Sequence, residues 1–132
     1  MINRYYGERW KTIPKSICPC TNNGYGNGVI YHPNQIYEVS NYGRVRNKHT
    51  KQLLTIRDYK GCSKVTIRGR YELTWRDDHN WFLKESKPMN LTISRLVVAT
   101  FIYGCDLKPW YIVRHLDGNS ANNCLENLDI KY

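Results

Sequence analysis

The sequence has no long hydrophobic run and no cysteine pattern of a secreted protein, and each absence excludes one class of protein. No stretch of about 18 apolar residues is present, so no transmembrane helix is expected. The first residues, Met1 to Tyr6, lack the apolar core of a signal peptide. The five cysteines are scattered and odd in number, which does not describe a disulfide framework. The sequence therefore predicts an intracellular protein, not a secreted one.

Acidic residues are also few. The 132 residues include 20 Lys and Arg but only 11 Asp and Glu, which gives a net charge of +9. A fold gains no stability from such an excess, which is typical of proteins that bind a polyanion. Nucleic acid is the first candidate for that polyanion, and an anionic membrane surface is the second. At this length we expect one domain, with or without an appendage.

Two short stretches carry residue types that bind metals, but neither predicts a metal site. Cys18 and Cys20 could form half of a zinc site, yet no second close pair of Cys or His completes it. Asp77, Asp78 and His79 are adjacent at the polar tip of an expected hairpin, where neighbouring side chains rarely converge on one ion. We interpret the cysteines as reduced loop residues and the tip as solvated.

The chain divides into a polar beginning and an ordered remainder. Residues 1–34 are rich in turn-forming residues and are predicted to be an irregular extension of a domain that covers 35–132. Two runs rich in Val, Ile and Tyr predict a hairpin at about 36–47, with Asn41–Gly43 as a three-residue loop that ends on a glycine at positive φ. Alternating runs between 63 and 93 predict further strands that complete a small antiparallel sheet.

The clearest helix follows this sheet. Residues 94–103 are mostly apolar, with Thr92 or Ser94 able to cap the start and Gly104 placed to end it. Two more apolar runs predict a C-terminal hairpin within 111–132. The predicted fold class is α+β: a small antiparallel sheet, one buried helix and a C-terminal ββ hairpin.

This last hairpin contains the most specific motif of the sequence. From Val113 to Leu128 the chain matches V-x-H-x-D-G-N-x-x-N-N-x-x-x-N-L at every fixed position. The pattern resembles the core of the HNH homing endonucleases of the phage and intron type, which here would cover residues 90–132. The stretch from Tyr37 to Arg46, with Trp10 to Pro14 before it, resembles the modular DNA-binding motif that often precedes that core. It lies in a basic hairpin motif at 35–60.

The resemblance implies cleavage of DNA phosphodiesters by one His and one divalent metal, Mg²⁺ or another. His115 matches the general base, and Asn127 matches the Asn that braces the loop and orients that His. Asp117 is the candidate metal ligand. In many relatives a metal ligand stands where this sequence has Arg114. The sequence ends at Tyr132, before the helix that completes this core in the family, so we expect a hairpin of the ββα-metal type lacking its final helix.

Basic residues group on the first hairpin and on the strand expected after it. Alternate residues of a strand share a face, so neighbouring cations can contact successive phosphates. The residues predicted to bind nucleic acid are Arg44, Arg46, Lys48, Lys51, Lys64, Arg68 and, next to His115, Arg114. The expected partner is DNA before RNA, in a host cytoplasm, an organelle matrix or a phage particle. No membrane partner is predicted.

Three interpretations of function remain open. The sequence favours a nucleic-acid-binding protein of the HNH homing endonuclease family in which phosphodiester cleavage is degenerate or absent and no cofactor is needed. The alternative is an active Mg²⁺-dependent endonuclease or nickase with His115 as general base. A further alternative is a structural subunit of a ribonucleoprotein or phage assembly.

Overall fold

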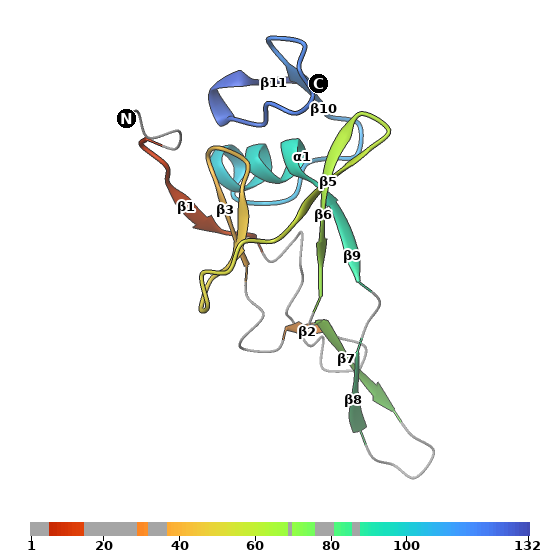
Figure 1. Ribbon diagram of the computed structural model, residues 1–132. Coiled ribbons are helices and arrows are strands. Elements are labelled where there is room, and N and C mark those ends of the chain that lie inside the picture. The colour runs from red at the N-terminus through yellow and green to blue at the C-terminus, as the bar shows by residue number, and fades with distance from the viewer. Residues whose placement is uncertain (1–5, 15–28, 32–36, 69, 76–80, 86–87) are drawn as a thin grey trace.

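The computed structural model describes residues 6–14, 29–31, 37–68, 70–75, 81–85 and 88–132 (Figure 1). The Cys18 and Cys20 pair and the tip at Asp77 to His79 lie outside the described residues. The described part contains four small antiparallel sheets and one helical segment, which confirms the predicted α+β class. None of its helices has the length and apolar character needed to cross a membrane.

The first sheet is built around the predicted hairpin. Its strands are β1 (Trp10–Thr12), β3 (Tyr37–Ser40) and β4 (Val45–Asn47), in the order β1-β3-β4. The amide of Ser40 donates to the carbonyl of Arg44 at 2.8 Å, which closes the three-residue loop, and Gly43 has a φ of 84° as expected. The strand β1 lies where we predicted only irregular structure. Pairing with β3 stabilises it, and Ile13 just after it is buried.

The strands predicted between 63 and 93 form two sheets and not one. In the first, β6 (Cys62–Ile67) lies between β5 (Ile56–Tyr59) and β9 (Met89–Thr92). In the second, β7 (Arg70–Trp75) lies between β2 (Val29–Tyr31) and β8 (Trp81–Glu85). The hairpin of β7 and β8 extends away from the helix (Figure 1). The strand β5 was not predicted.

The helical segment lies where the sequence predicts it, but it begins as an α-helix and ends as a π-helix. The α-helix α1 covers Ile93–Val98, and a π-helix, η2, covers Ala99–Tyr103. Thr92 is the N-cap residue, although its side chain makes no capping hydrogen bond. Gly104 ends the segment with a φ of 69°, and its amide donates to the carbonyl of Ala99 at 2.7 Å.

The predicted C-terminal hairpin is present. The strands β10 (Ile112–His115) and β11 (Leu128–Lys131) are antiparallel, and the short 3-10 helix η3 (Leu125–Asn127) precedes β11. The segment α1–η2 lies between this hairpin and the sheet of β1, β3 and β4 (Figure 1). The core joins this segment to the first sheet, to β6 and, through Leu128, to the C-terminal hairpin. Its fully buried apolar side chains are Val39, Val45, Val65, Ile67, Ile93, Leu96, Val97 and Val98.

Candidate functional site

His115 is the last residue of β10 and faces the interior side of the C-terminal hairpin. It lies opposite Leu128 of β11, and its side chain is half-buried. Its Nε2 atom lies 2.8 Å from Oδ1 of Asn123, which is itself 7% exposed. An amide oxygen only accepts hydrogen bonds, so Nε2 carries a proton in this arrangement and Nδ1 of a neutral ring keeps the lone pair. That tautomer can accept a proton at Nδ1.

The loop after His115 is held by its own polar side chains. Asp117 Oδ1 accepts from the amide of Asn119 at 2.8 Å and from Nδ2 of Asn127 at 2.9 Å. Asp117 Oδ2 accepts from Nδ2 of Asn122, also at 2.9 Å. Hydrogen bonds from Asn122, then from Asn119 and Asn127, lower the pKa of Asp117 below its ordinary value. The carboxylate is therefore the centre of the loop's hydrogen-bond network.

Asn127 braces the loop, as the motif implies, but a different Asn contacts the histidine. Asn127 Oδ1 accepts from the amide of Asp117 at 3.1 Å, and its Nδ2 donates to the carbonyl of Asn122 at 2.9 Å. The described contacts of Asn127 are with the loop, whereas Asn123 reaches His115. Sequence reasoning placed Asn123 in the loop without giving it this role. The fixed Asn pair at 122–123 of the motif is the signal that could have identified it.

The turn between β3 and β4 packs against this loop. The amide of Leu125 donates to the carbonyl of Asn41 at 2.8 Å. Gly43 lies so close to the loop that an added Cβ would be 2.9 Å from Cβ of Asn123. The first hairpin thus packs directly against the residue that binds His115. This contact connects the two motifs recognised in the sequence.

The residues near His115 do not fit a divalent metal ion. Both oxygens of Asp117 already accept hydrogen bonds within the loop. Arg114 lies opposite Asp129 on the paired strand, and their side chains form an ion pair at 2.5 Å that lowers the pKa of Asp129. Within the described residues, no three His, Cys, Asp or Glu side chains form a group that could hold a metal. Hard cations prefer several oxygen ligands, whereas Asp117 is engaged in the loop and the side chain next to His115 is a cation.

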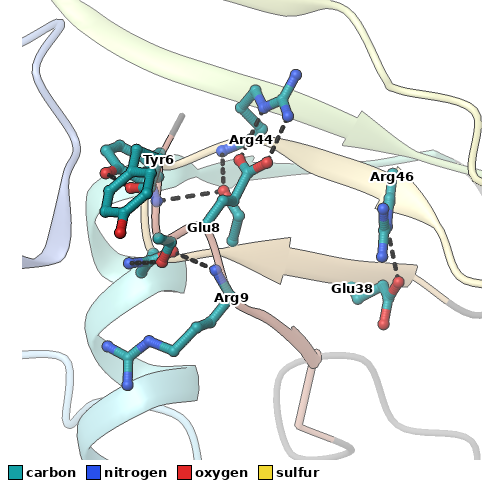
Figure 2. A network of polar contacts seen from close by, with 10 residues as sticks. Tyr6, Glu8, Arg9, Glu38, Arg44 and Arg46 are labelled. Carbon is teal, nitrogen blue, oxygen red and sulfur yellow. Dashed lines mark hydrogen bonds and ion pairs between the residues drawn. The ribbon is translucent and has the colours of Figure 1, made fainter. Parts of the chain in front are cut away.

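The predicted nucleic-acid contacts Arg44 and Arg46 lie within ion pairs (Figure 2). Arg44 binds Glu8 through Nε at 2.8 Å and Nη2 at 2.5 Å. Arg46 binds Glu38 at 2.7 Å, and its guanidinium carbon lies 3.8 Å from the ring centre of Trp10. Burial raises the pKa of Glu8, but the hydrogen bonds from Arg44 and Ser40 and the charges of Arg44 and Arg46 outweigh it and lower that pKa.

Of the other predicted cations in the first hairpin and on β6, Lys48, Lys51 and Arg68 are exposed and Lys64 is half-buried. Lys51 is 3.4 Å from the same Glu38 oxygen that binds Arg46, whereas Lys48 lies exposed in the turn after β4. Lys64 lies on β6 and Arg68 follows that strand, and neither forms an ion pair with a described residue. The structure therefore separates the predicted basic residues into a paired group and an unpaired group. Their roles in binding nucleic acid stay predictions.

Two cavities flank the loop of the C-terminal hairpin. One, of about 490 Å³, is lined by His115, Asn123, Val113 and Ser120 and, from the tip of the β5–β6 hairpin, by Gly61 and Cys62. The other, of about 510 Å³, lies between the same loop and the turn of the first hairpin, at Tyr42 to Arg44. His115 thus faces an open space whose opposite wall is the β5–β6 hairpin.

Comparison with known proteins agrees with this architecture. The chain is similar to a solved structure of the HNH homing endonuclease I-HmuI, with a TM-score of 0.54 and 22% sequence identity. The fold resembles that of an HNH homing endonuclease. The match covers 93% of this chain and 52% of the other, so the chain spans about half the length of I-HmuI. No family model matches the chain, and no curated protein matches it in sequence.

Proposed function

We propose that this chain is a nucleic-acid-binding protein of the HNH homing endonuclease family, with DNA as its partner and with cleavage degenerate or lost. The observation that carries the proposal is the arrangement around His115. His115 is held by Asn123 at the base of a loop closed by the Asp and Asn side chains of the motif, and the fold is similar to a solved structure of an HNH homing endonuclease described as binding and cleaving DNA. The candidate metal ligand Asp117 instead accepts hydrogen bonds from loop amides, and the residue next to His115 is a cation, Arg114, paired with Asp129.

The retained residues still have a chemical use. His115, with its proton on Nε2 directed to Asn123, can accept a hydrogen bond or a proton at Nδ1. Cleavage of a phosphodiester also needs positive charge where negative charge grows in the transition state. Arg114 is the cation next to His115, and Asp129 neutralises it. The site can therefore hold a nucleic-acid strand more readily than it can cut one.

Binding is tested by fluorescence anisotropy with labelled duplex DNA and with RNA of the same sequence. A protein that engages about four phosphates loses roughly 100-fold in affinity between roughly 50 and 200 mM salt, because each contact releases counterions. We expect a slope of this size on DNA. Binding that does not respond to salt contradicts the proposal, and tighter binding to RNA would change the assigned partner.

An active endonuclease or nickase is the second candidate, and one observation favours it. His115 lines an open cavity and has Nδ1 available for a proton. The test incubates supercoiled duplex DNA with the protein and Mg²⁺ or Mn²⁺, beside the His115→Ala variant. We expect wild type and variant to give the same background. A metal-dependent nick that His115→Ala abolishes would establish the enzyme and reject the degenerate assignment.

A further inference from the structure

A second group of basic residues lies on the β5–β6 hairpin, apart from the first hairpin. Arg57 lies opposite Lys64, and Tyr59 lies opposite Cys62. Residues opposite each other in an antiparallel pair share a face, so these four side chains project from one side of the sheet. The ring of Tyr59 lies 5.6 Å from Nζ of Lys60 and 5.3 Å from Nζ of Lys64. We call Arg57, Tyr59, Lys60 and Lys64 the basic hairpin face.

This face has two features that cost stability in the isolated fold. Arg57 and Lys64 are like charges directly opposite each other, which destabilises a strand pair. Lys60 and Gly61 have φ values of 51° and 82°, as in the tight turn that favours Asn, Asp or Gly at both positions. A lysine here has a less suitable backbone conformation and adds a third positive charge. Neither feature helps the hairpin to form.

No described carboxylate offsets these charges. Arg57, Lys60 and Lys64 form no ion pair within the described residues. Asp58 is in the same hairpin but alternates onto the opposite face, where it lies across from Ser63. Arg44 and Arg46, by contrast, are each bound to a glutamate at 2.5–2.7 Å. The basic hairpin face thus presents the cations that an external polyanion can engage without first breaking an ion pair.

The face continues into a cavity at each end. Arg57 and Arg68 line one of about 470 Å³, together with the polar side chains of Asn47 and Gln52. At the tip, Gly61 and Cys62 line the cavity of about 490 Å³ that contains His115. The hairpin tip stands beside the C-terminal hairpin (Figure 1). The unpaired cations therefore form a track that leads to His115.

We propose that the basic hairpin face binds the sugar–phosphate backbone of nucleic acid and guides that strand to the cavity at His115. The inference rests on the proposed function, since it names the surface that binds the polyanion. It also assigns Arg44, Arg46 and Lys51, which lie beside Glu8 or Glu38, to holding the first sheet together and not to binding nucleic acid. Contacts to phosphates carry no sequence information, so the face should act equally on all duplexes.

The first experiment compares Lys60→Asn with Lys51→Asn. Both lysines have positive φ, 51° and 63°, and both changes remove one charge, but Lys51 already lies beside Glu38. Asn tolerates positive φ, so Lys60→Asn should fold at least as well as wild type, which a thermal melt checks. Each lost phosphate contact lowers the slope of log affinity against log salt by about 0.9, or roughly eightfold in affinity at about 0.1 M salt.

We expect that loss for Lys60→Asn on every duplex tested, and no change of slope for Lys51→Asn. Equal slopes for wild type and Lys60→Asn would overturn the proposal while leaving nucleic-acid binding intact. A greater loss for Lys51→Asn would overturn it too. A wild type that binds no nucleic acid at any salt would instead refute the proposed function itself.

The second experiment follows the thiol of Cys62, which is exposed at the hairpin tip. Iodoacetamide labelling of the wild type, read by peptide mass spectrometry, is run with and without saturating duplex DNA. We expect DNA to slow the labelling of Cys62 and to leave the exposed Cys105, beyond the helical segment, unchanged. Cys62 that labels equally fast with and without DNA would show that the strand does not reach the His115 cavity.

Discussion

Replacing Gly43 by alanine should destabilise the protein more than the same change at any other described glycine. Gly43 has a φ of 84°, where a side chain costs roughly 1–2 kcal/mol. The new Cβ would also lie 2.9 Å from Cβ of Asn123, 3.1 Å from its carbonyl oxygen and 3.3 Å from Ile93. Overpacking of this kind costs typically about 1–3 kcal/mol. We therefore expect a total loss of about 2–5 kcal/mol.

Gly104→Ala is the matched control. Gly104 also has a positive φ, of 69°, but an added Cβ there would meet nothing within 4 Å. This variant should lose only the backbone cost, about 1–2 kcal/mol. The free energy of unfolding of both variants is measured by urea denaturation with wild type in parallel. Two variants of equal stability would refute the claim that the first hairpin packs tightly against the loop that holds His115.

The remaining predictions concern the same loop. Asn123→Ala should cost about 1–3 kcal/mol of stability, because it leaves His115 without the partner of its Nε2 proton, and the ring ¹⁵N shifts of His115 should report a mixture of tautomers. An unchanged NMR spectrum of the ring would contradict this. Asp117 has a lowered pKa in the folded state, so its contribution to stability is present above about pH 4 and is lost as the pH falls through the folded pKa. Urea denaturation between about pH 2 and 6 should therefore show a smaller pH dependence for Asp117→Asn than for wild type.

Elements with local sequence patterns were predicted correctly. The first hairpin, the start and end of the helical segment and the C-terminal hairpin each have a turn residue or an apolar period within a few residues. The strand β5 has no apolar period, since all four residues of Ile56–Tyr59 are exposed, and only Gly61 after it is a turn residue. Its stability comes from pairing with β6, which single-strand patterns do not reveal. The division of 63–93 into two sheets likewise depends on pairing, because β6 pairs with β5 and β9 whereas β7 pairs with β8 and with the distant β2.

The π-helical end of the helical segment had no signal in the sequence. An apolar run predicts that a helix is buried but not which carbonyl each amide contacts. In η2 the amide of Gly104 reaches back five residues to Ala99. Thr100, within η2, has a buried hydroxyl without a hydrogen-bond partner among the described residues. Such local costs are tolerated where packing on several sides fixes the backbone, as it does between the first sheet and the C-terminal hairpin.

The motif predicted that His115 and the Asp and Asn residues of the loop lie together, but it did not predict all of their contacts. His115 and the Asp and Asn loop follow from a motif whose members lie within sixteen positions, so their proximity is set by the chain itself. The partner of His115 was harder to predict, because four Asn residues are available between positions 119 and 127 and only the fold selects among them. Asn123, the Asn that reaches His115, is also the one that packs against Gly43 of the first hairpin.

The basic residues show why the sequence alone does not reveal which cations already have a carboxylate partner in the fold. Arg44 and Arg46 have the alternation expected of two phosphate contacts, yet Glu8, 36 positions before Arg44, reaches one of them and Glu38 reaches the other. A cation already bound to a carboxylate must give up that partner before it can bind a phosphate. The same reasoning distinguishes Lys51 from Lys60, which share residue type and positive φ and differ in having Glu38 nearby. Since a lysine at positive φ stabilises neither turn, the one without a carboxylate is where an external anion has most to contribute.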